Sequence, residues 1–222
     1  MSELTQDEKR DIALALFGAK CVLFGDFTLA SGQRSRYYLD LRRLQSFPLY
    51  LETVAMGLAV ASEGLEIDRF SGIPEAAGPM ATALSLRVGI GTITLRKEQK
   101  DHGAGGQIMG YYEKGMRVCA VDDVITTGAS KLKTIEPFTE AGLEIVRFQV
   151  VVDRQQGGLA QVAEAGYEAD ALLTVSEAME VYRENDLISP DQYKIVADYL
   201  EQEAARLEKE AKILAERQSG GG

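Results

Sequence analysis

The sequence has 222 residues, of which 45% are hydrophobic and 26% are charged, and both fractions are ordinary for a folded globular protein. Acidic residues outnumber basic ones by 34 to 24. The resulting net charge of −10 argues against nucleic acid as a partner, because Lys and Arg side chains supply most of that affinity. No segment has the composition of a linker, so we expect one main domain.

Neither a membrane segment nor a secretory leader is expected. No apolar run approaches the length of a membrane span, and no charged-then-apolar stretch opens the chain. The cysteines are Cys21 and Cys119, and Cys119 lies in an apolar run where a small buried side chain is the ordinary interpretation. These features favour a reduced, cytoplasmic setting.

The first part of the chain predicts a helix followed by strand-like segments. Thr5 and Glu8 have the spacing of a capping box, which marks the start of an apolar helix. Residues 21–29 have strand composition and lead through a Ser-Gly turn to Tyr37 and Tyr38. Successive side chains of a strand face opposite sides, so at most one of these tyrosines can pack on a ligand. A hairpin with ordinary strand tyrosines is the alternative.

Downstream, segments of strand and helix character alternate. Strands are expected in the apolar run from residue 118 and at 69–74, 89–95, 143–152 and 169–175. Helices are expected from residues 130 and 176 and at 46–64, 79–86 and 159–165. This alternation predicts an α/β fold with a mostly parallel central sheet and helices on both faces.

The last predicted element is a long charged helix at residues 190–217. Apolar residues recur along it at helical spacing and form a narrow stripe: Val196, Tyr199, Leu200, Leu207 and Leu214. Residues 177–217 hold eleven acids and six bases, so they carry −5 of the net charge. The stripe can pack on the domain or on a second subunit. Residues 218–222 are expected to be a disordered tail.

The apolar run from residue 118 ends in Asp122 and Asp123, and two threonines and Gly128 follow before the next helix. Open α/β sheets bind ligands at the carboxyl edge of their strands, where this acidic pair is expected to lie. Backbone N–H groups and hydroxyls at a helix start favour a phosphate. The carboxylates repel phosphate but suit ribose hydroxyls or a Mg²⁺ ion. The pattern therefore favours a sugar phosphate as the ligand.

A basic, glycine-rich segment lies at residues 96–106. It contains four potential cations: Arg96, Lys97, Lys100 and His102. His102 is the only histidine in the chain, and it stands beside a glycine rather than on an apolar face. Positive side chains on such a loop can stabilise the negative charge of an anionic ligand. A solvated surface hairpin is the alternative interpretation.

Arg154 follows a predicted strand and precedes the glycines at 157 and 158. At the carboxyl end of a strand, an arginine can pair through two hydrogen bonds with the carboxylate of a ligand. A structural ion pair with a nearby acid is the alternative.

Two of these motifs together resemble a known family. The sequence Asp-Asp-Val-Ile-Thr-Thr-Gly-Ala-Ser at residues 122–130 is similar to the signature with which type I phosphoribosyltransferases bind 5-phosphoribosyl-1-pyrophosphate (PRPP). Residues 96–106 resemble the mobile catalytic loop of orotate phosphoribosyltransferases. The resemblance extends over residues 17–182. It implies the type I phosphoribosyltransferase fold in a domain of residues 1–189 that includes a small N-terminal hood, with the helix at 190–217 as an addition.

The resemblance also implies a reaction and a set of site residues. PRPP and orotate would give orotidine 5′-monophosphate and pyrophosphate, a step of pyrimidine biosynthesis. The implied catalytic residues are Lys100, His102, Asp122 and Asp123. PRPP would contact these four together with Arg96, Lys97, Val124, Ile125, Thr126, Thr127, Gly128, Ala129 and Ser130. Orotate would contact Tyr38, Leu39, Thr126 and Arg154.

Cofactor and partners follow from the same resemblance. Mg²⁺ would be held mainly through PRPP rather than by protein ligands. The basic loop would serve the neighbouring subunit's site in a homodimer, and no nucleic acid or membrane partner is expected.

The sequence departs from the family pattern at two positions. Many relatives carry lysines where this chain has Ala30 and Ala77. Arg34 or Arg36 can replace one charge, and main-chain N–H groups of the turn at 74–78 can still bind pyrophosphate. Two alternatives remain: a phosphoribosyltransferase for another base, and a PRPP-binding regulator without catalysis. The basic loop favours an enzyme, because a regulator has little use for leaving-group catalysis.

Overall fold

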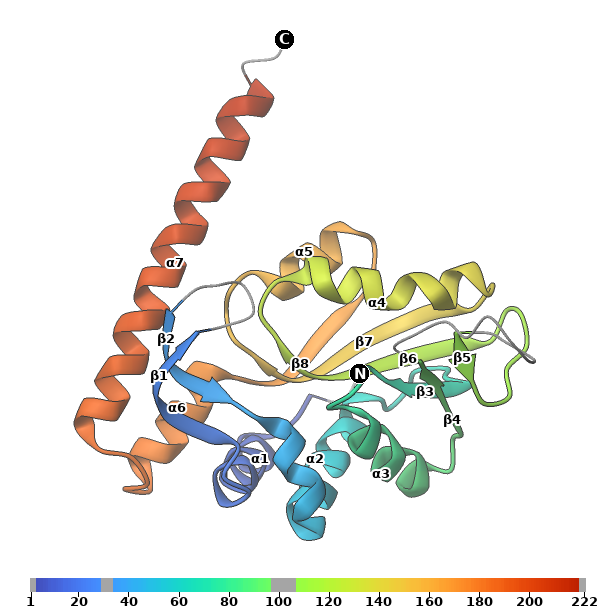
Figure 1. Ribbon diagram of the computed structural model, residues 1–222, viewed down its shortest axis with the longest axis horizontal. Helices are drawn as coiled ribbons and strands as arrows, with labels where there is room; N and C mark the ends of the chain where they lie inside the picture. Colours follow the sequence, from blue (N-terminus) through green and yellow to red (C-terminus); the bar gives the residue numbers. More distant parts are fainter. Residues whose placement is uncertain (1–2, 29–33, 97–106, 220–222) are drawn as a thin grey trace.

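The computed structural model describes residues 3–28, 34–96 and 107–219, which form a six-stranded sheet flanked by helices and a separate two-stranded sheet (Figure 1). The strands are β1 Val22–Thr28, β2 Arg34–Leu39, β3 Arg69–Gly72, β4 Thr92–Leu95, β5 Ile108–Met109, β6 Arg117–Ile125, β7 Glu144–Asp153 and β8 Ala169–Thr174. The helices are α1 Gln6–Gly18, α2 Pro48–Ala61, α3 Gly78–Val88, α4 Gly128–Glu140, α5 Gly158–Glu164, α6 Val175–Glu184 and α7 Pro190–Ser219, with a 3₁₀ helix at Leu41–Ser46. Among the described residues, no helix combines the length and apolar character needed to span a membrane.

The central sheet has the strand order β5-β4-β3-β6-β7-β8. Its described strands pair in parallel except for the short β5, which is antiparallel to β4. Helices α1, α2, α3 and α6 cover one face and α4 and α5 cover the other (Figure 1). A separate cluster of buried apolar side chains lies beneath each layer. The predicted α/β fold with a mostly parallel sheet is confirmed.

Strands β1 and β2 form the small antiparallel sheet that corresponds to the predicted hood. Side chains of β2 alternate in exposure along the strand. Tyr37 is fully buried and Leu39 is nearly so, whereas Tyr38 faces the other side and is half-buried. The predicted opposition of the two tyrosines is confirmed, and Tyr37 belongs to the core.

Several element ends differ from the predicted ones. The strand predicted at 89–95 starts only at Thr92, because Gly89 adopts a left-handed conformation (φ 74°) and ends α3. The helix predicted at 46–64 starts at Pro48, after the 3₁₀ helix, and ends at Ala61. The helix predicted from residue 130 starts already at Gly128. Residues 218 and 219 of the expected tail belong to α7.

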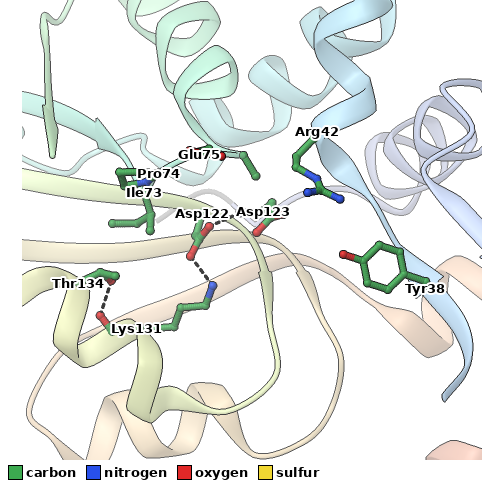
Figure 2. Close-up of a pocket in the computed structure, with 10 residues that line it drawn as sticks. Tyr38, Arg42, Ile73, Pro74, Glu75, Asp122, Asp123, Lys131 and Thr134 are labelled. Atoms are coloured by element: carbon green, nitrogen blue, oxygen red, sulfur yellow. Dashed lines mark hydrogen bonds and ion pairs between the residues drawn. The ribbon is translucent and has the colours of Figure 1, made fainter. Parts of the chain in front are cut away.

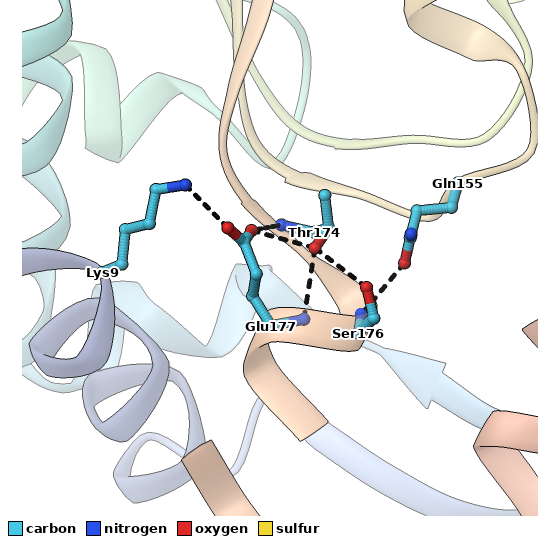
Figure 3. Close-up of polar contacts among 5 residues, drawn as sticks. All are labelled: Lys9, Gln155, Thr174, Ser176 and Glu177. Atoms are coloured by element: carbon cyan, nitrogen blue, oxygen red, sulfur yellow. Dashed lines mark hydrogen bonds and ion pairs between the residues drawn. The ribbon is translucent and has the colours of Figure 1, made fainter. Parts of the chain in front are cut away.

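Hydrogen bonds at helix starts connect distant parts of the chain. The predicted capping box of α1 is confirmed, and α6 starts with a second one formed by Thr174 and Glu177. Glu177 also pairs with Lys9 of α1 at 2.7 Å (Figure 3). Gln155 accepts a hydrogen bond of 3.0 Å from the Ser176 backbone N–H, which ties the loop after β7 to the start of α6.

Helix α7 packs on the body with its first half and projects away from it with its second half (Figure 1). Val196 is fully buried. The ring of Tyr199 stands edge-on to that of Tyr37 in β2, with 5.6 Å between the centroids. Leu207 lies so close to Gly157 that a Cβ atom on this glycine would come within 3.1 Å of the leucine Cδ2. At these positions the predicted stripe packs on the domain.

This docking of α7 predicts a stability effect at Val196. Val196→Ala leaves a cavity at a position without exposed surface, so the free energy of unfolding should fall by about 1–3 kcal/mol. Ile213→Ala, on the projecting half where Ile213 is 39% exposed, should change it by less than about 0.5 kcal/mol. Urea denaturation followed by circular dichroism measures both variants. Equal changes in the free energy of unfolding of the two variants would contradict the packing of α7 on the domain.

Candidate active site

A cavity of about 340 Å³ lies at the carboxyl end of β6, the strand between β3 and β7 (Figure 2). Its walls come from β2, the 3₁₀ helix, the turn after β3, β6 and the first turns of α4. The lining residues are Tyr38, Arg42, Ile73, Pro74, Glu75, Ala76, Asp122, Asp123, Lys131 and Thr134. Three carboxyl side chains and two cationic ones therefore share one cavity.

The two acids of β6 are oriented by hydrogen bonds within the site. Asp122 is only 3% exposed, and its Oδ2 lies 2.5 Å from Nζ of Lys131. Its Oδ1 accepts a hydrogen bond of 2.8 Å from the Asp123 backbone N–H. Asp123 in turn accepts one of 2.7 Å from the Val124 backbone N–H. Both carboxylates are held before any ligand binds, and Asp122 also has a cationic partner.

The buried position changes the acidity of Asp122. Burial raises the pKa of this carboxyl above its ordinary value, because the charged form loses hydration. The neighbouring carboxylate of Asp123 also raises the pKa, whereas the ammonium of Lys131 lowers it. The ionised form of Asp122 therefore depends on Lys131.

The loop between β6 and α4 has a backbone suited to an anion. Thr127, the residue before the helix, is extended and does not cap the helix with its side chain. The N–H of Gly128 donates a hydrogen bond of 2.9 Å to Oε1 of Gln161 in α5. A Cβ atom at residue 128 would lie 2.7 Å from the Gln161 Cβ, so the close approach of α5 requires glycine there. Helix-start N–H groups of this kind favour phosphate.

The turn after β3 forms another wall of the cavity. Ile73, Pro74, Glu75 and Ala76 line it. That this turn receives pyrophosphate stays a prediction. Ala77 is fully buried, so its methyl group points into the core. The turn therefore brings no basic side chain to the cavity wall.

Comparison with known proteins places this architecture in one family. Residues 59–165 match the model of the phosphoribosyl transferase domain. The chain is 36% identical over 174 residues to the orotate phosphoribosyltransferase of Pyrococcus furiosus, a match that covers 78% of this chain and 96% of that protein. This chain belongs to the orotate phosphoribosyltransferase family.

Solved structures agree with this placement. Leishmania donovani UMP synthase superposes with a TM-score of 0.82 at 36% identity, over 87% of this chain and 42% of that chain. The orotate phosphoribosyltransferase of Mycobacterium tuberculosis H37Rv superposes with a TM-score of 0.68 at 28% identity, over 77% of this chain and 98% of that chain. This chain thus spans less than half of the UMP synthase. The predicted type I phosphoribosyltransferase fold is confirmed.

Among the orotate residues implied by the family, Tyr38 lines the cavity. Its ring packs against that of Phe27 in β1, with 5.5 Å between the centroids. Leu39 is 8% exposed, belongs to the core cluster and does not line the cavity. Thr126 lies in the loop after β6 and is half-buried.

Arg154, for which the resemblance implies contact with the orotate carboxylate, lies on the side of β2 opposite to Tyr38. Its guanidinium carbon is 4.6 Å from the centroid of the Tyr37 ring, and its Nη2 donates a hydrogen bond of 3.4 Å to Ser35. Tyr37 and Ser35 alternate with Tyr38 along the strand. This structure therefore does not bring Arg154 and Tyr38 together at the cavity. The backbone N–H of Arg154 donates to the Ile125 carbonyl, which fixes its loop beside the end of β6.

The basic loop is described only at its start. Lys97, Lys100 and His102 lie outside the described residues, as does Ala30, and their implied roles stay predictions. Arg96 follows β4 and lines a second cavity of about 190 Å³. Pro74 and Thr134 line both cavities, so the loop starts next to the site.

Sequence reasoning missed several residues that build the site, among them Arg42, Lys131 and Gln161. Lys131 stands one residue beyond the 122–130 motif, and helical spacing from Gly128 would have placed it on the first turn. Arg42 and Gln161 carried no such signal, because the packing of other elements brings them to the site.

The buried carboxyl of Asp122 predicts a pH-dependent stability difference. A carboxyl whose pKa is raised in the folded state binds more protons there than in the unfolded chain. The stability of wild type relative to Asp122→Asn should therefore fall as the pH rises from about 4 towards neutral. Urea denaturation at several pH values measures this difference, with Glu140→Gln at an exposed position of α4 as the control. A difference that rose over this range would contradict the raised pKa.

Proposed function

We propose that this chain is an orotate phosphoribosyltransferase, which transfers the 5-phosphoribosyl group from PRPP to orotate in pyrimidine biosynthesis. The observation that carries the proposal is the convergence of three features on one cavity in a chain of this family. These are the Asp122–Asp123 pair, Lys131 and Thr134 in the first turns of α4, and the turn after β3.

Each part of the cavity has a role in this reaction. The loop at 126–130 binds the 5′-phosphate, and Asp122 and Asp123 accept hydrogen bonds from the ribose hydroxyls. The pyrophosphate lies against the turn after β3. A ring nitrogen of orotate loses its proton to solvent and bonds to C1 of the ribose, while pyrophosphate leaves with the electron pair of its bond to C1, with inversion at C1. Cations of the basic loop, among them Lys100 and His102, stabilise the negative charge that grows on the leaving group.

Mg²⁺ enters this proposal as a partner of PRPP. Among the described residues, no group of three or more His, Cys, Asp or Glu side chains is arranged to hold a metal ion. In this proposal, oxygens of the pyrophosphate supply most of the ligands, in keeping with the preference of Mg²⁺ for substrate phosphates. We also place the enzyme in the cytoplasm, where the buried free thiols of Cys21 and Cys119 stay reduced.

One observation favours a second candidate function. Tyr38 lines the cavity, but Arg154 faces the opposite side of β2 and does not reach it. The arginine that lines the cavity with Tyr38 is Arg42, which is already paired with Asp40. A base without a carboxylate would not need that contact. The alternative is therefore a phosphoribosyltransferase for another base.

Consumption of orotate, followed by its ultraviolet absorbance, tests the proposal. It should require both PRPP and Mg²⁺. Asp123→Asn and Lys100→Ala should each lower kcat/KM by about 100-fold or more, because each removes a charge that stabilises the transition state. Lys209→Ala, at an exposed position of α7, should leave the rate unchanged.

The other outcomes separate the alternatives. Turnover of PRPP with a different base and none with orotate would support the second candidate. PRPP binding in calorimetry without turnover of any base would leave a binding protein and contradict the enzyme.

The proposed enzyme is a homodimer, supported by exposed apolar side chains on two neighbouring helices. Leu49 of α2 and Leu86 of α3 are 83% and 82% exposed, and Met56 and Val88 are also exposed. An ion pair between Arg87 and Glu52 joins the two helices in the same region. An apolar surface of this kind is typical of a protein interface.

Leu86→Asp should therefore convert a dimer into a monomer in sedimentation velocity, because it places a charge within the apolar surface. Ile213→Asp, a matched change on α7, should leave the dimer intact. If the basic loop serves the neighbouring site, mixing Lys100→Ala and Asp123→Asn subunits should restore part of the activity. A monomeric wild type would contradict the dimer.

A further inference from the structure

The cavity contains more negative than positive side chains, although the proposed substrate is itself an anion. Asp122, Asp123 and Glu75 line it together with Arg42 and Lys131. PRPP adds a phosphate and a pyrophosphate to this set. Each cation that reaches the cavity therefore matters for binding.

The two cations are held differently. Arg42 pairs with Asp40 at 2.6 Å on the hood side, and its side chain is 56% exposed. Lys131 has a side chain that is only 16% exposed, and it contacts Asp122, whose side chain is 4% exposed. Charges shielded from water interact more strongly with a ligand than exposed ones. Lys131 is the better placed of the two.

Lys131 also stands between two parts of the proposed substrate site. It lies on the first turn of α4, directly after the loop at 126–130 that would bind the 5′-phosphate. Figure 2 shows its side chain reaching towards Asp122, on the side of the cavity where Ile73 and Pro74 of the turn also lie. That turn has no lysine of its own, and the methyl group of Ala77 points into the core.

We propose that Lys131 is a substrate-binding residue whose ammonium group contacts the pyrophosphate of PRPP while it keeps Asp122 as a partner. An ammonium has three N–H donors, so one can remain on the Asp122 carboxylate while another reaches a pyrophosphate oxygen. Lys131 thereby supplies, from α4, a positive charge next to a turn after β3 that has no basic residue of its own. This inference rests on the proposed use of PRPP but not on the identity of the base.

A double variant can distinguish this binding role of Lys131 from a purely structural one. If the lysine served only to neutralise Asp122, removing both charges together would restore the affinity for pyrophosphate. If the ammonium contacts pyrophosphate directly, the double variant stays weak. Asp122→Asn combined with Lys131→Met therefore distinguishes the two roles.

Calorimetric titration of the full chain with pyrophosphate and Mg²⁺ tests the proposal. Lys131→Met should weaken binding by about 10- to 100-fold, the loss expected for one charge-assisted hydrogen bond. Lys131→Arg should recover most of the affinity, and the double variant should not. Lys209→Met on α7 is the matched control. In steady-state assays Lys131→Met should raise the KM for PRPP and leave the KM for the base within about twofold.

Pyrophosphate affinity within about twofold of wild type in Lys131→Met, or full recovery in the double variant, would overturn the proposal. The titration needs no orotate, so it decides the role of Lys131 even if the acceptor is another base. A wild type that binds neither PRPP nor pyrophosphate would overturn both this inference and the proposed function.

Discussion

The ion pair between Lys131 and Asp122 is the interaction on which the site depends. Residues 118–121 of β6 have no exposed surface, and Asp122 continues the same buried strand. A carboxylate there is costly unless it is paired and hydrogen-bonded. Lys131 and the Asp123 backbone N–H meet this requirement, and together they fix the acid at the end of the sheet. The same pair joins β6 to α4, so the strand and the helix start keep one relative position.

A second buried group connects the hood to the rest of the molecule. Arg154, in the loop after β7, stacks on Tyr37 of β2, and Tyr199 of α7 packs edge-on against the same ring. The hydroxyl of Tyr199 accepts a hydrogen bond of 2.6 Å from Gln156. Three segments far apart in sequence thus meet behind the strand that presents Tyr38 to the cavity. Helix α7 thereby supports the base side of the site from the rear.

The sequence predicted the parts of this protein that local patterns determine. Strand and helix alternation gave the parallel sheet, and the acid pair before Gly128 located the carboxyl edge where the cavity lies. The direction of Arg154 could not be predicted, because it depends on Tyr37 and α7, which only the folded chain brings next to it. That Lys131 pairs with Asp122 could not be predicted either, for a related reason. A lysine on an amphipathic helix is ordinarily read as a solvated charge, and only burial against β6 distinguishes Lys131.

Because the net charge of the protein is −10, the attraction for an anionic substrate has to come from positive groups at the cavity itself. At physiological salt, the field of surface charges decays over about 8 Å, so the acidic surface acts weakly at the site and equally cannot attract an anion from a distance. The substrate is therefore attracted only by groups that it contacts. Lys131 is one such group and is shielded from water, and the start of α4 adds the positive end of a helix dipole. One rigid helix then carries both contributions. Glu75 and Asp123 remain in the wall, so the proposed substrate would meet less repulsion there as a Mg²⁺ complex than as the free anion.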